Sequence, residues 1–408
     1  MRLFVDPAPL RHSAPFRWLW GSSVVGGVAG QVGVFAVTFQ VFTLTGSSLA
    51  VAGIGVCVAL PTIAFTMIGG SLADRVDRRM LLLLGSATQL LIGLGFVAEA
   101  ALGAGSLPLI YGLVALQATV GALAGPARRA ILRRILPAAD MTGGIALTLL
   151  AMQVAQVAGP LLGGGIAGAA SVTWCFAAQV VGSALAVVAA VRLPSIPAEP
   201  APAAGVSPRG VREALRFVLA SPVLRGALLA DLAITVLAAP TALFPQLNAE
   251  RFGGSAETLG YLSAAVALGG VLGTLLSGPW ARVARPGRAL LLVSLGWALT
   301  IGALAVTGEL WLALVVLTVM GAADAAALTV GQSLVQTVTP DRIRGRVSAA
   351  EQIVQMGGPQ LGGLRAGGVG ALWGSAVGLA AGAAVAVIAL VVVAASNRPL
   401  WAYRDVLR

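Results

Sequence analysis

The chain has 408 residues, of which 58% are hydrophobic and only 10% are charged, and its mean hydropathy is +0.93. Soluble domains carry about 25% charged residues, so this composition excludes an ordinary soluble protein. The formal net charge is +11, but all 26 basic residues are arginines in short clusters between apolar runs, with no continuous basic face, which argues against nucleic-acid binding.

The residues that could carry metal or nucleophilic chemistry are few and scattered. Cys57 and Cys175 fall in apolar segments far apart, and the single histidine, His12, lies in the polar N-terminal tail. This pattern excludes a histidine-based metal site or catalytic dyad and suggests no disulfide framework. We therefore expect neither an enzyme nor a bound cofactor or metal.

Apolar runs long enough to cross a bilayer, about 20 residues each, recur along the whole chain. The first apolar run has no cleavage site at its end and is longer than a signal-peptide core, so we expect an uncleaved first helix. The runs lie at about 17–42, 48–72, 80–102, 107–125, 143–168, 173–192, 225–247, 259–280, 289–307, 310–333, 348–371 and 373–396. The sequence predicts an all-α polytopic membrane protein with twelve transmembrane helices in two six-helix bundles.

The segment between the two sets of runs, 193–224, is rich in proline and alanine and reads as a linker. Its second part begins with Ser207 and Pro208, a plausible helix start, and has apolar residues at helical spacing with arginines between them. We expect a short amphipathic helix on the membrane surface. The predicted parts are an N-terminal bundle, 1–192, a cytoplasmic linker, 193–224, and a C-terminal bundle, 225–408.

The arginines predict the orientation. If the N-terminus is cytoplasmic, 24 of the 26 arginines fall on the cytoplasmic side, which leaves Arg251 outside and Arg365 within a span. This agrees with the positive-inside rule. We therefore expect a multi-pass protein of the cell membrane, embedded in the lipid bilayer, with both termini cytoplasmic.

The two halves also resemble each other. Gly159-Pro160-Leu161-Leu162-Gly163-Gly164 in the fifth predicted span recurs as Gly358-Pro359-Gln360-Leu361-Gly362-Gly363 in the eleventh, 199 residues later. Parallel repeats joined by a linker are typical of transporters whose substrate path lies between the halves.

The segment from Gly70 to Arg79 resembles the loop signature of the major facilitator superfamily, at the same place between the second and third spans. The resemblance implies the major facilitator fold. It also implies a gating motif, in which Asp74 contacts the inner end of the eleventh span and helps to hold the outward-open state. The alternative is that the arginines only obey the positive-inside rule. Asp77 stands where the signature usually has glycine. The gating residues are Gly70, Asp74, Arg75, Arg78 and Arg79.

Other stretches are similar to a subgroup of bacterial exporters of drugs and enterobactin: residues 16–21, 126–131 and 340–347. Residues 155–164 resemble the antiporter signature of drug-exporting members, with Ala155 in place of its first glycine. This motif, Gly159, Pro160, Gly163 and Gly164, implies export. Pro160 can kink the span, and the glycines offer a face on which a neighbouring helix can rock; simple tight packing is the alternative.

Ionisable residues within the spans require a reason, because each costs about 2.5–3.5 kcal/mol on insertion scales. Asp324, among small residues in the tenth span, is the main candidate for proton coupling or cation binding, and Asp231 is the second, with an interfacial position as its alternative. Arg365 could snorkel, pair with Asp324 or attract an anionic substrate. We expect Glu99 at the headgroups, and Glu351 in a structural or latch role.

Polar uncharged residues at mid-depth indicate the substrate path, although each alone is more often a helix–helix contact. Together with Arg365, the predicted substrate-cavity residues are Gln31, Gln117, Gln153, Gln156, Gln355 and Gln360. We expect a monomeric secondary active transporter with a small-molecule substrate, namely a proton-coupled exporter of a drug or siderophore that uses the proton gradient by alternating access. The alternatives are an importer or facilitator of a metabolite, and a non-transporting sensor or partner subunit.

Overall fold

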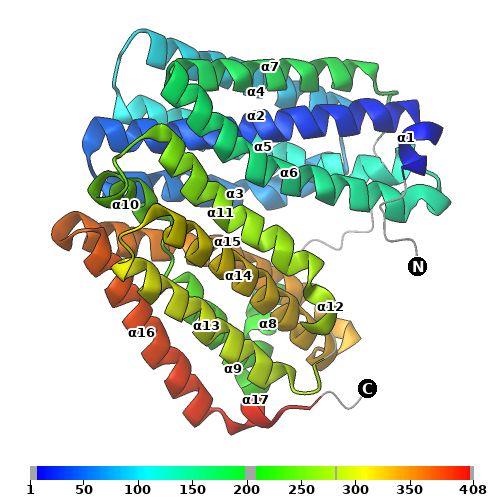
Figure 1. The fold of residues 1–408 in the computed structure, drawn as a ribbon. Helices are drawn as coiled ribbons and strands as arrows, with labels where there is room; N and C mark the ends of the chain where they lie inside the picture. Colours follow the sequence, from blue (N-terminus) through cyan, green and yellow to red (C-terminus); the bar gives the residue numbers. More distant parts are fainter. Residues whose placement is uncertain (1–6, 198–207, 281–282, 405–408) are drawn as a thin grey trace. The chain divides into compact units, whose positions relative to one another are not determined.

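The computed structural model describes residues 7–197, 208–280 and 283–404. Within these ranges the chain is helical with short connections, and it contains no β-strand there (Figure 1). By their contacts the residues form two compact units, 1–44 with 56–205 and 45–55 with 206–408. The all-α prediction is confirmed. Residues 198–207 of the predicted linker, with Ser207, lie outside the described ranges.

The helices of the N-terminal part of the chain follow the first six predicted spans. Their bounds are α1 (Ala8–His12), α2 (Ala14–Thr45), α3 (Ser48–Ala73), α4 (Arg78–Ala101), α5 (Leu107–Ile135), η1 (Ala138–Asp140), α6 (Met141–Ala169) and α7 (Val172–Arg192). Helices α4 and α7 run side by side (Figure 1). Phe96 and Phe176 stack between them with ring centroids 5.0 Å apart, and both side chains are fully buried. Such aromatic pairs stabilise a helix interface beyond the area that they bury.

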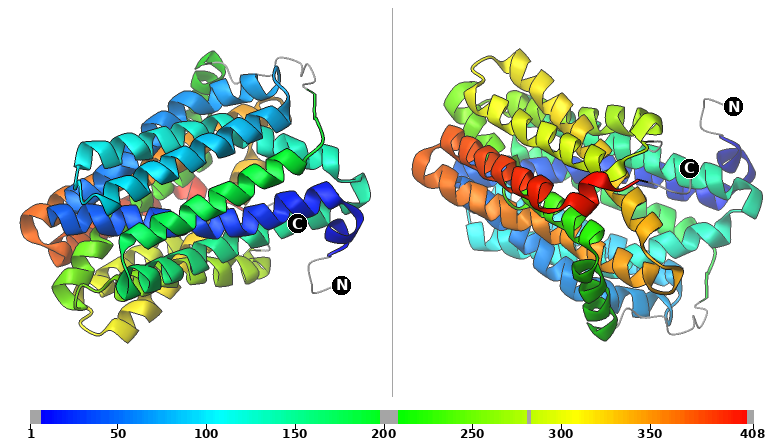
Figure 2. Two further views of the ribbon diagram at one scale, coloured as in Figure 1. Left: turned by 90° about the horizontal axis from the view of Figure 1, so that it is seen from above. Right: turned by 90° about the horizontal axis from the view of Figure 1, so that it is seen from below.

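The helices of the C-terminal part belong to the second unit. Their bounds are α8 (Pro208–Ala220), α9 (Pro222–Thr235), η2 (Thr241–Leu243), α10 (Phe244–Arg251), α11 (Ala256–Leu275), α12 (Ser277–Trp280), α13 (Pro286–Val306), α14 (Leu310–Val338), α15 (Asp341–Trp373), α16 (Ser375–Ser396) and α17 (Arg398–Ala402). Helix α16 packs against α13 and α15, and the right view of Figure 2 shows it, in red, beside them.

Small residues bring α11 and α14 together. A β-carbon on Gly269 would lie 2.0 Å from the Thr318 carbonyl oxygen, and one on Gly321 would lie 2.1 Å from the Val266 carbonyl oxygen. The two backbones are therefore in direct contact, which is the packing that small residues permit between membrane helices. The outer faces remain apolar and exposed, as at Leu91, Val319 and Ile388. Such surface suits lipid.

Ten described helices are long and apolar enough to cross a membrane, or eleven if the bent pair Arg212–Ala220 and Pro222–Thr235 is one span. The prediction of one continuous helix over 225–247 is wrong. The chain leaves α9 after Thr235 and restarts at η2, with Pro240 and Pro245 at the new helix starts, where a missing N–H costs nothing. Helix α15 covers the predicted span 348–371 without a break, but it is more polar than these ten helices and is not one of them.

The amphipathic helix predicted near Ser207 is confirmed as α8, bent by 104° from α9. Ala214, Phe217 and Val218 pack in a cluster with residues of α9, α14 and α15. Glu213 of α8 also pairs with Arg346 of α15 at 2.6 Å. Part of the apolar face is thus covered by protein, whereas the sequence predicted a helix that only rests on the membrane.

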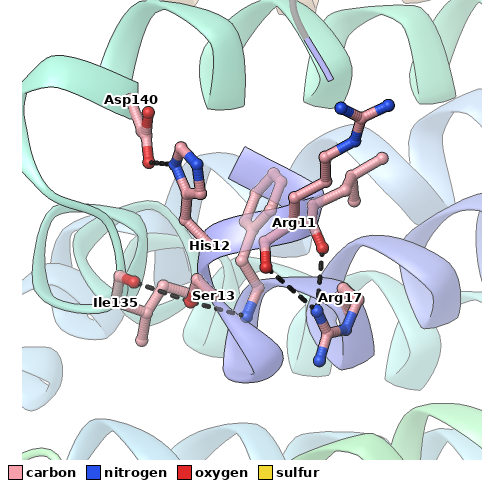
Figure 3. Close-up of polar contacts among 8 residues, drawn as sticks. Arg11, His12, Ser13, Arg17, Ile135 and Asp140 are labelled. Carbon is pink, nitrogen blue, oxygen red and sulfur yellow. Dashed lines mark hydrogen bonds and ion pairs between the residues drawn. The ribbon is translucent and has the colours of Figure 1, made fainter. Parts of the chain in front are cut away.

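The N-terminal tail is anchored to the turn after α5 (Figure 3). His12 Nδ1 lies 2.9 Å from an Asp140 carboxylate oxygen, and Ser13 Oγ donates to the Ile135 carbonyl at 2.9 Å. Arg17 donates to the carbonyls of Leu10 and Arg11. The single histidine therefore has a structural contact near the first span.

Glu99, expected at the headgroups, lies in the last turn of α4 and is buried there by its neighbours. Its side chain is 2% exposed. It accepts a hydrogen bond from Gln40 Nε2 of α2 at 2.6 Å and another from the Ser106 backbone N–H at 3.2 Å. Buried carboxylates persist where hydrogen bonds satisfy them, and this one joins α2, α4 and the start of α5.

Candidate functional site

Seven polar residues line a cavity of about 340 Å³ inside the second unit. Helices α8, α9, α13, α14 and α15 form its walls, which are mostly apolar. Its volume falls at the lower end of the range for small-molecule sites. The polar residues that line it are Asp231, Thr235, Ser294, Asp324, Gln332, Glu351 and Gln355.

Helical periodicity explains why these residues meet. In α14 the lining positions are Asp324, then 327, 328, 331, 332 and 335, which is one face of a helix. Gly321, three residues before Asp324, is pressed against α11, and Thr318 and Ala322 contact the same helix. These contacts lie beside the lining face of α14 and fix the rotation of the helix, so that Asp324 borders the cavity. Its side chain is exposed although it lies at mid-helix, because it borders the cavity.

Asp231 reaches the same cavity from α9, whose lining positions 224, 227, 228, 231, 234 and 235 repeat at helical spacing. Thr235 Oγ1 donates to the Asp231 carbonyl at 2.8 Å, which closes the last turn before the helix ends. Glu351 comes from α15. The sequence assigned it a structural or latch role, whereas the structure places it on the wall with Asp231 and Asp324.

Ser294 of α13 is a lining residue that the sequence did not single out. It is fully buried, and its Oγ has no hydrogen-bond partner among the described residues. A buried hydroxyl without a partner costs about 1–3 kcal/mol, so a bound molecule or water that pairs with it gains that amount. A lone serine in an apolar run carries no sequence signal.

Arg365 lies on α15 but is not among the residues that line this cavity. Its guanidinium is close to α16, where a β-carbon on Gly382 would meet Arg365 Nη2 at 2.6 Å. Its Nε is buried without a hydrogen-bond partner in the described part of the chain. The guanidinium thus packs on α16, away from the wall that carries Asp324.

The predicted glutamines fall at several places. Gln355 lines the cavity with the acidic residues. In the first unit, Gln31 Nε2 donates to Gln156 Oε1 at 3.4 Å, so α2 and α6 bring this pair together. The Gln117 carbonyl accepts from Gln89 at 3.0 Å. Gln153 is half-buried on α6, and Gln360 lies against Gly55.

The proposed gating motif surrounds the start of α4. Asp77 caps this helix, because its carboxylate accepts the N–H of Arg79 at 2.8 Å and that of Met80 at 3.3 Å. Its φ of −53° is ordinary, which explains why an aspartate can replace the usual glycine. Ser195 Oγ donates to the same carboxylate, and this hydrogen bond holds the pKa of Asp77 below its usual value.

The other members of the motif differ in exposure. Arg79 donates to the carbonyls of Ala190 and Val191 in the last turn of α7, at 3.3 and 2.8 Å, where a cation is favoured by the helix dipole. The backbone N–H of Arg78 donates to the Ile196 carbonyl, and its side chain is buried. Asp74 and Arg75 are exposed, and Gly70 has open space where a side chain would be.

The glycine motif packs in the same way in both units. In α6, a β-carbon on Gly159 would lie 2.2 Å from Gln31 Cβ, and one on Gly163 would lie 2.8 Å from the Phe35 ring. In α15, the equivalent Gly358 and Gly362 lie against Thr235 of α9. Each glycine pair therefore packs on the first spanning helix of its half. Pro160 and Pro359 both lie inside their helices, and Gly164 is buried.

No group of three or more His, Cys, Asp or Glu side chains in the described residues could hold a metal ion. The three carboxylates share a cavity but are not grouped as metal ligands. Their arrangement suits exchangeable protons or a ligand larger than a metal ion.

The family described as "Transmembrane secretion effector" matches residues 6–406. The enterobactin exporter EntS of Shigella boydii is 30% identical over 349 residues, which is 85% of this chain and 81% of that protein. The enterobactin exporter EntS of Escherichia coli is 30% identical over 309 residues, covering 75% of this chain and 73% of that protein.

Solved structures of transporters have the same fold. A bacterial homolog of the human lysosomal transporter Spinster, in an inward-facing and unoccupied conformation, is 17% identical, covers 95% of this chain and 96% of its own, and has a TM-score of 0.70. The nucleoside transporter NupG is 13% identical, covers 96% of this chain and 100% of its own, and has a TM-score of 0.73.

Proposed function

Since this chain belongs to the major facilitator superfamily, in the family of transmembrane secretion effectors, we propose that it is a proton-coupled exporter of a siderophore-like or drug-like organic molecule. Family membership makes it a multi-pass membrane protein and a secondary transporter of a small molecule, not an enzyme. The coupling ion, the direction and the substrate class are the proposed part.

The observation that carries the proposal is that Asp324 of α14 and Asp231 of α9 line one cavity inside the second unit. Carboxylates within membrane helices are costly and are retained mainly along ion and proton pathways. Proton binding neutralises a carboxylate and removes most of that cost, so the two protonation states favour different surroundings. Such a difference is what couples proton movement to a conformational change.

The direction of transport follows from the relatives, which are exporters. The glycine motif of α6 and its copy in α15 pack each helix closely on α2 or α9, a smooth contact that suits sliding during alternating access. An importer or facilitator of a metabolite is the second transport candidate. A non-transporting sensor or partner subunit has no evident use for carboxylates that line a cavity within the helices.

The remaining parts of the proposal complete the mechanism. The bundles 1–192 and 225–408 rock about the linker 193–224, and Gly70, Asp74, Arg75, Arg78 and Arg79 stabilise one of the two states. The protein acts as a monomer in the cell membrane, with both termini cytoplasmic and no nucleic-acid partner. The proton gradient replaces any bound cofactor. Gln31, Gln156 and Gln355 contact substrate, together with Gln117, Gln153, Gln360 and Arg365.

Reconstitution into liposomes with an imposed pH difference tests the proposal. Enterobactin and a panel of drugs are loaded, and efflux is followed with a pH-sensitive dye on the opposite side. We expect Asp324→Asn to abolish efflux driven by the pH difference while the protein still folds as a monodisperse species. Glu309→Gln, at an exposed carboxylate outside the cavity, should retain it. Unchanged coupling in Asp324→Asn would refute the assignment.

A further inference from the structure

The described residues that line the cavity of the second unit include three carboxylates and no basic side chain. Asp231, Asp324 and Glu351 are the only ionisable groups among the described residues that line it. The charged groups elsewhere on the lining helices have other surroundings: Arg346 pairs with Glu213, Arg344 with Asp341, and Arg288 lies over the Trp401 ring. Arg212, Arg216, Arg225, Arg342 and Arg365 are likewise absent from the lining.

Negative charges in one mostly apolar cavity repel each other and lose their hydration, so the wall is stable only when something neutralises it. Protons can do this, and so can a cation. A metal ion does not fit, because no three of the acidic, histidine or cysteine side chains that the structure describes are grouped as metal ligands. An organic cation contacts polar groups through hydrogen bonds, which do not require the short distances and fixed geometry of metal coordination, and a cavity of about 340 Å³ has room for its apolar body.

Ser294 supplies an independent indication of a ligand. It is 0% exposed, it borders the cavity, and its Oγ is unpaired among the described residues. A hydroxyl can accept a hydrogen bond from an ammonium group, and an ammonium has donors for several acceptors at once. Leu228, Val335 and Val354 form apolar wall beside these groups. The chemistry of the site is therefore polar and negative at one part and apolar around it.

We propose that the cavity between α9, α13, α14 and α15 binds a protonated amine on an apolar body, held by Asp231, Asp324, Glu351 and the Ser294 hydroxyl. Amine binding displaces protons from the carboxylates, because either partner neutralises the same charges. This inference rests on the proposed function for its meaning in transport, since the displaced protons would be those that are exchanged. The binding itself is independent of transport.

Calorimetry on the full chain in lipid nanodiscs tests the proposal with three ligands that share one body: phenylbutylamine, phenylbutanol and phenylbutyrate. The ammonium gains hydrogen bonds to charged groups worth about 1.5–3 kcal/mol, so the amine should bind about 10–100-fold more tightly than the alcohol. The butyrate should not bind. Titration in buffers of different ionisation enthalpy should show proton release with the amine only.

Variants locate the site. Asp324→Asn and Glu351→Gln should each weaken amine binding about tenfold or more, and Ser294→Ala about threefold to tenfold. Glu309→Gln is the matched control and should bind as the parent chain does. Should Asp324→Asn fail to fold, Glu351→Gln and Ser294→Ala still decide the result. Equal binding of amine and alcohol, tighter binding of butyrate, displacement of protons by sodium alone, or full amine binding in both carboxylate variants would overturn the proposal.

The experiments distinguish a failure of the amine site from a failure of the proposed proton-coupled function. If phenylbutylamine binds with proton release but efflux from liposomes ignores the pH difference, the amine site stands and the proton-coupled function fails. If efflux follows the pH difference while the amine does not bind, the coupling stands and the amine site is refuted.

Discussion

Replacing Gly159 of α6 by alanine should loosen the contact between α6 and α2. The added β-carbon would lie 2.2 Å from Gln31 Cβ and 3.2 Å from Gln31 backbone atoms. Carbon atoms prefer a separation of about 3.5–4.0 Å, so the helices would have to separate by about 1.5 Å. Neither the added β-carbon nor Gln31 Cβ can rotate away, because the backbone fixes the position of each. Such overpacking costs about 1–3 kcal/mol.

Gly165→Ala is the matched control for this change. It lies on the same helix, and a β-carbon there would meet nothing within 4 Å. Both variants gain helix propensity of about 1 kcal/mol over glycine, and the comparison cancels this gain. The midpoint temperature of unfolding, measured by intrinsic fluorescence in detergent, should therefore be lower for Gly159→Ala than for Gly165→Ala by several degrees. Equal midpoints would show that α2 and α6 do not touch at this glycine.

Two further changes address polar contacts of the first unit. Asp77→Ala removes the cap of α4 and should lower the free energy of unfolding by about 0.5–2 kcal/mol, whereas Asp77→Asn keeps most of the cap. The pKa of Asp77 lies below 3.8 in the folded chain. The stability that the ionised carboxylate adds is therefore complete above pH 3.8 and is lost as the pH falls through the folded-state pKa. Melting curves over a pH series test this, and the same loss of stability at acid pH in Asp77→Asn would contradict it. Glu99→Leu leaves the Gln40 amide and the Ser106 N–H without their acceptor and should lower the free energy of unfolding by about 1–3 kcal/mol. Glu99→Gln keeps an acceptor oxygen and should lower it less in the same melting assay. Equal losses of stability in the two variants would mean that the acceptor oxygens do not matter.

The sequence predicted the helical class and most of the spans because apolar runs of membrane length are visible without tertiary information. It failed at 225–247, where hydropathy continues from α9 into α10 although the helix stops after Thr235. Hydropathy averages over a window and does not register a break within an apolar run. Pro240 and Pro245 were the available indication.

The candidate site was predicted in part. Asp324 and Asp231 stood out because a charge in an apolar run is rare, and both line the cavity. The sequence suggested a structural or latch role for Glu351 and a headgroup position for Glu99, because a single sequence indicates the depth of a residue along its helix and not the direction of its side chain. Which way each carboxylate points depends on the helices that pack around its own helix, and Glu99 is buried because Gln40 of α2 lies beside it.

The same reasoning explains why the acidic cavity and the glycine contacts occur together in the second unit. Gly358 and Gly362 press α15 onto α9 at Thr235, one turn beyond Asp231. Glu351 lies two turns before Gly358 on α15. The close contact of Gly358 and Gly362 with Thr235 therefore brings Glu351 of α15 and Asp231 of α9 to the same cavity. Movement of α15 on α9 at these glycines would change the separation of Glu351 and Asp231 directly. Protons that neutralise the carboxylates, or a cation between them, favour the closer arrangement, and their release favours the wider one. The glycine motif of α15 and the carboxylates of Asp231 and Glu351 therefore act on one helix pair, α9 and α15.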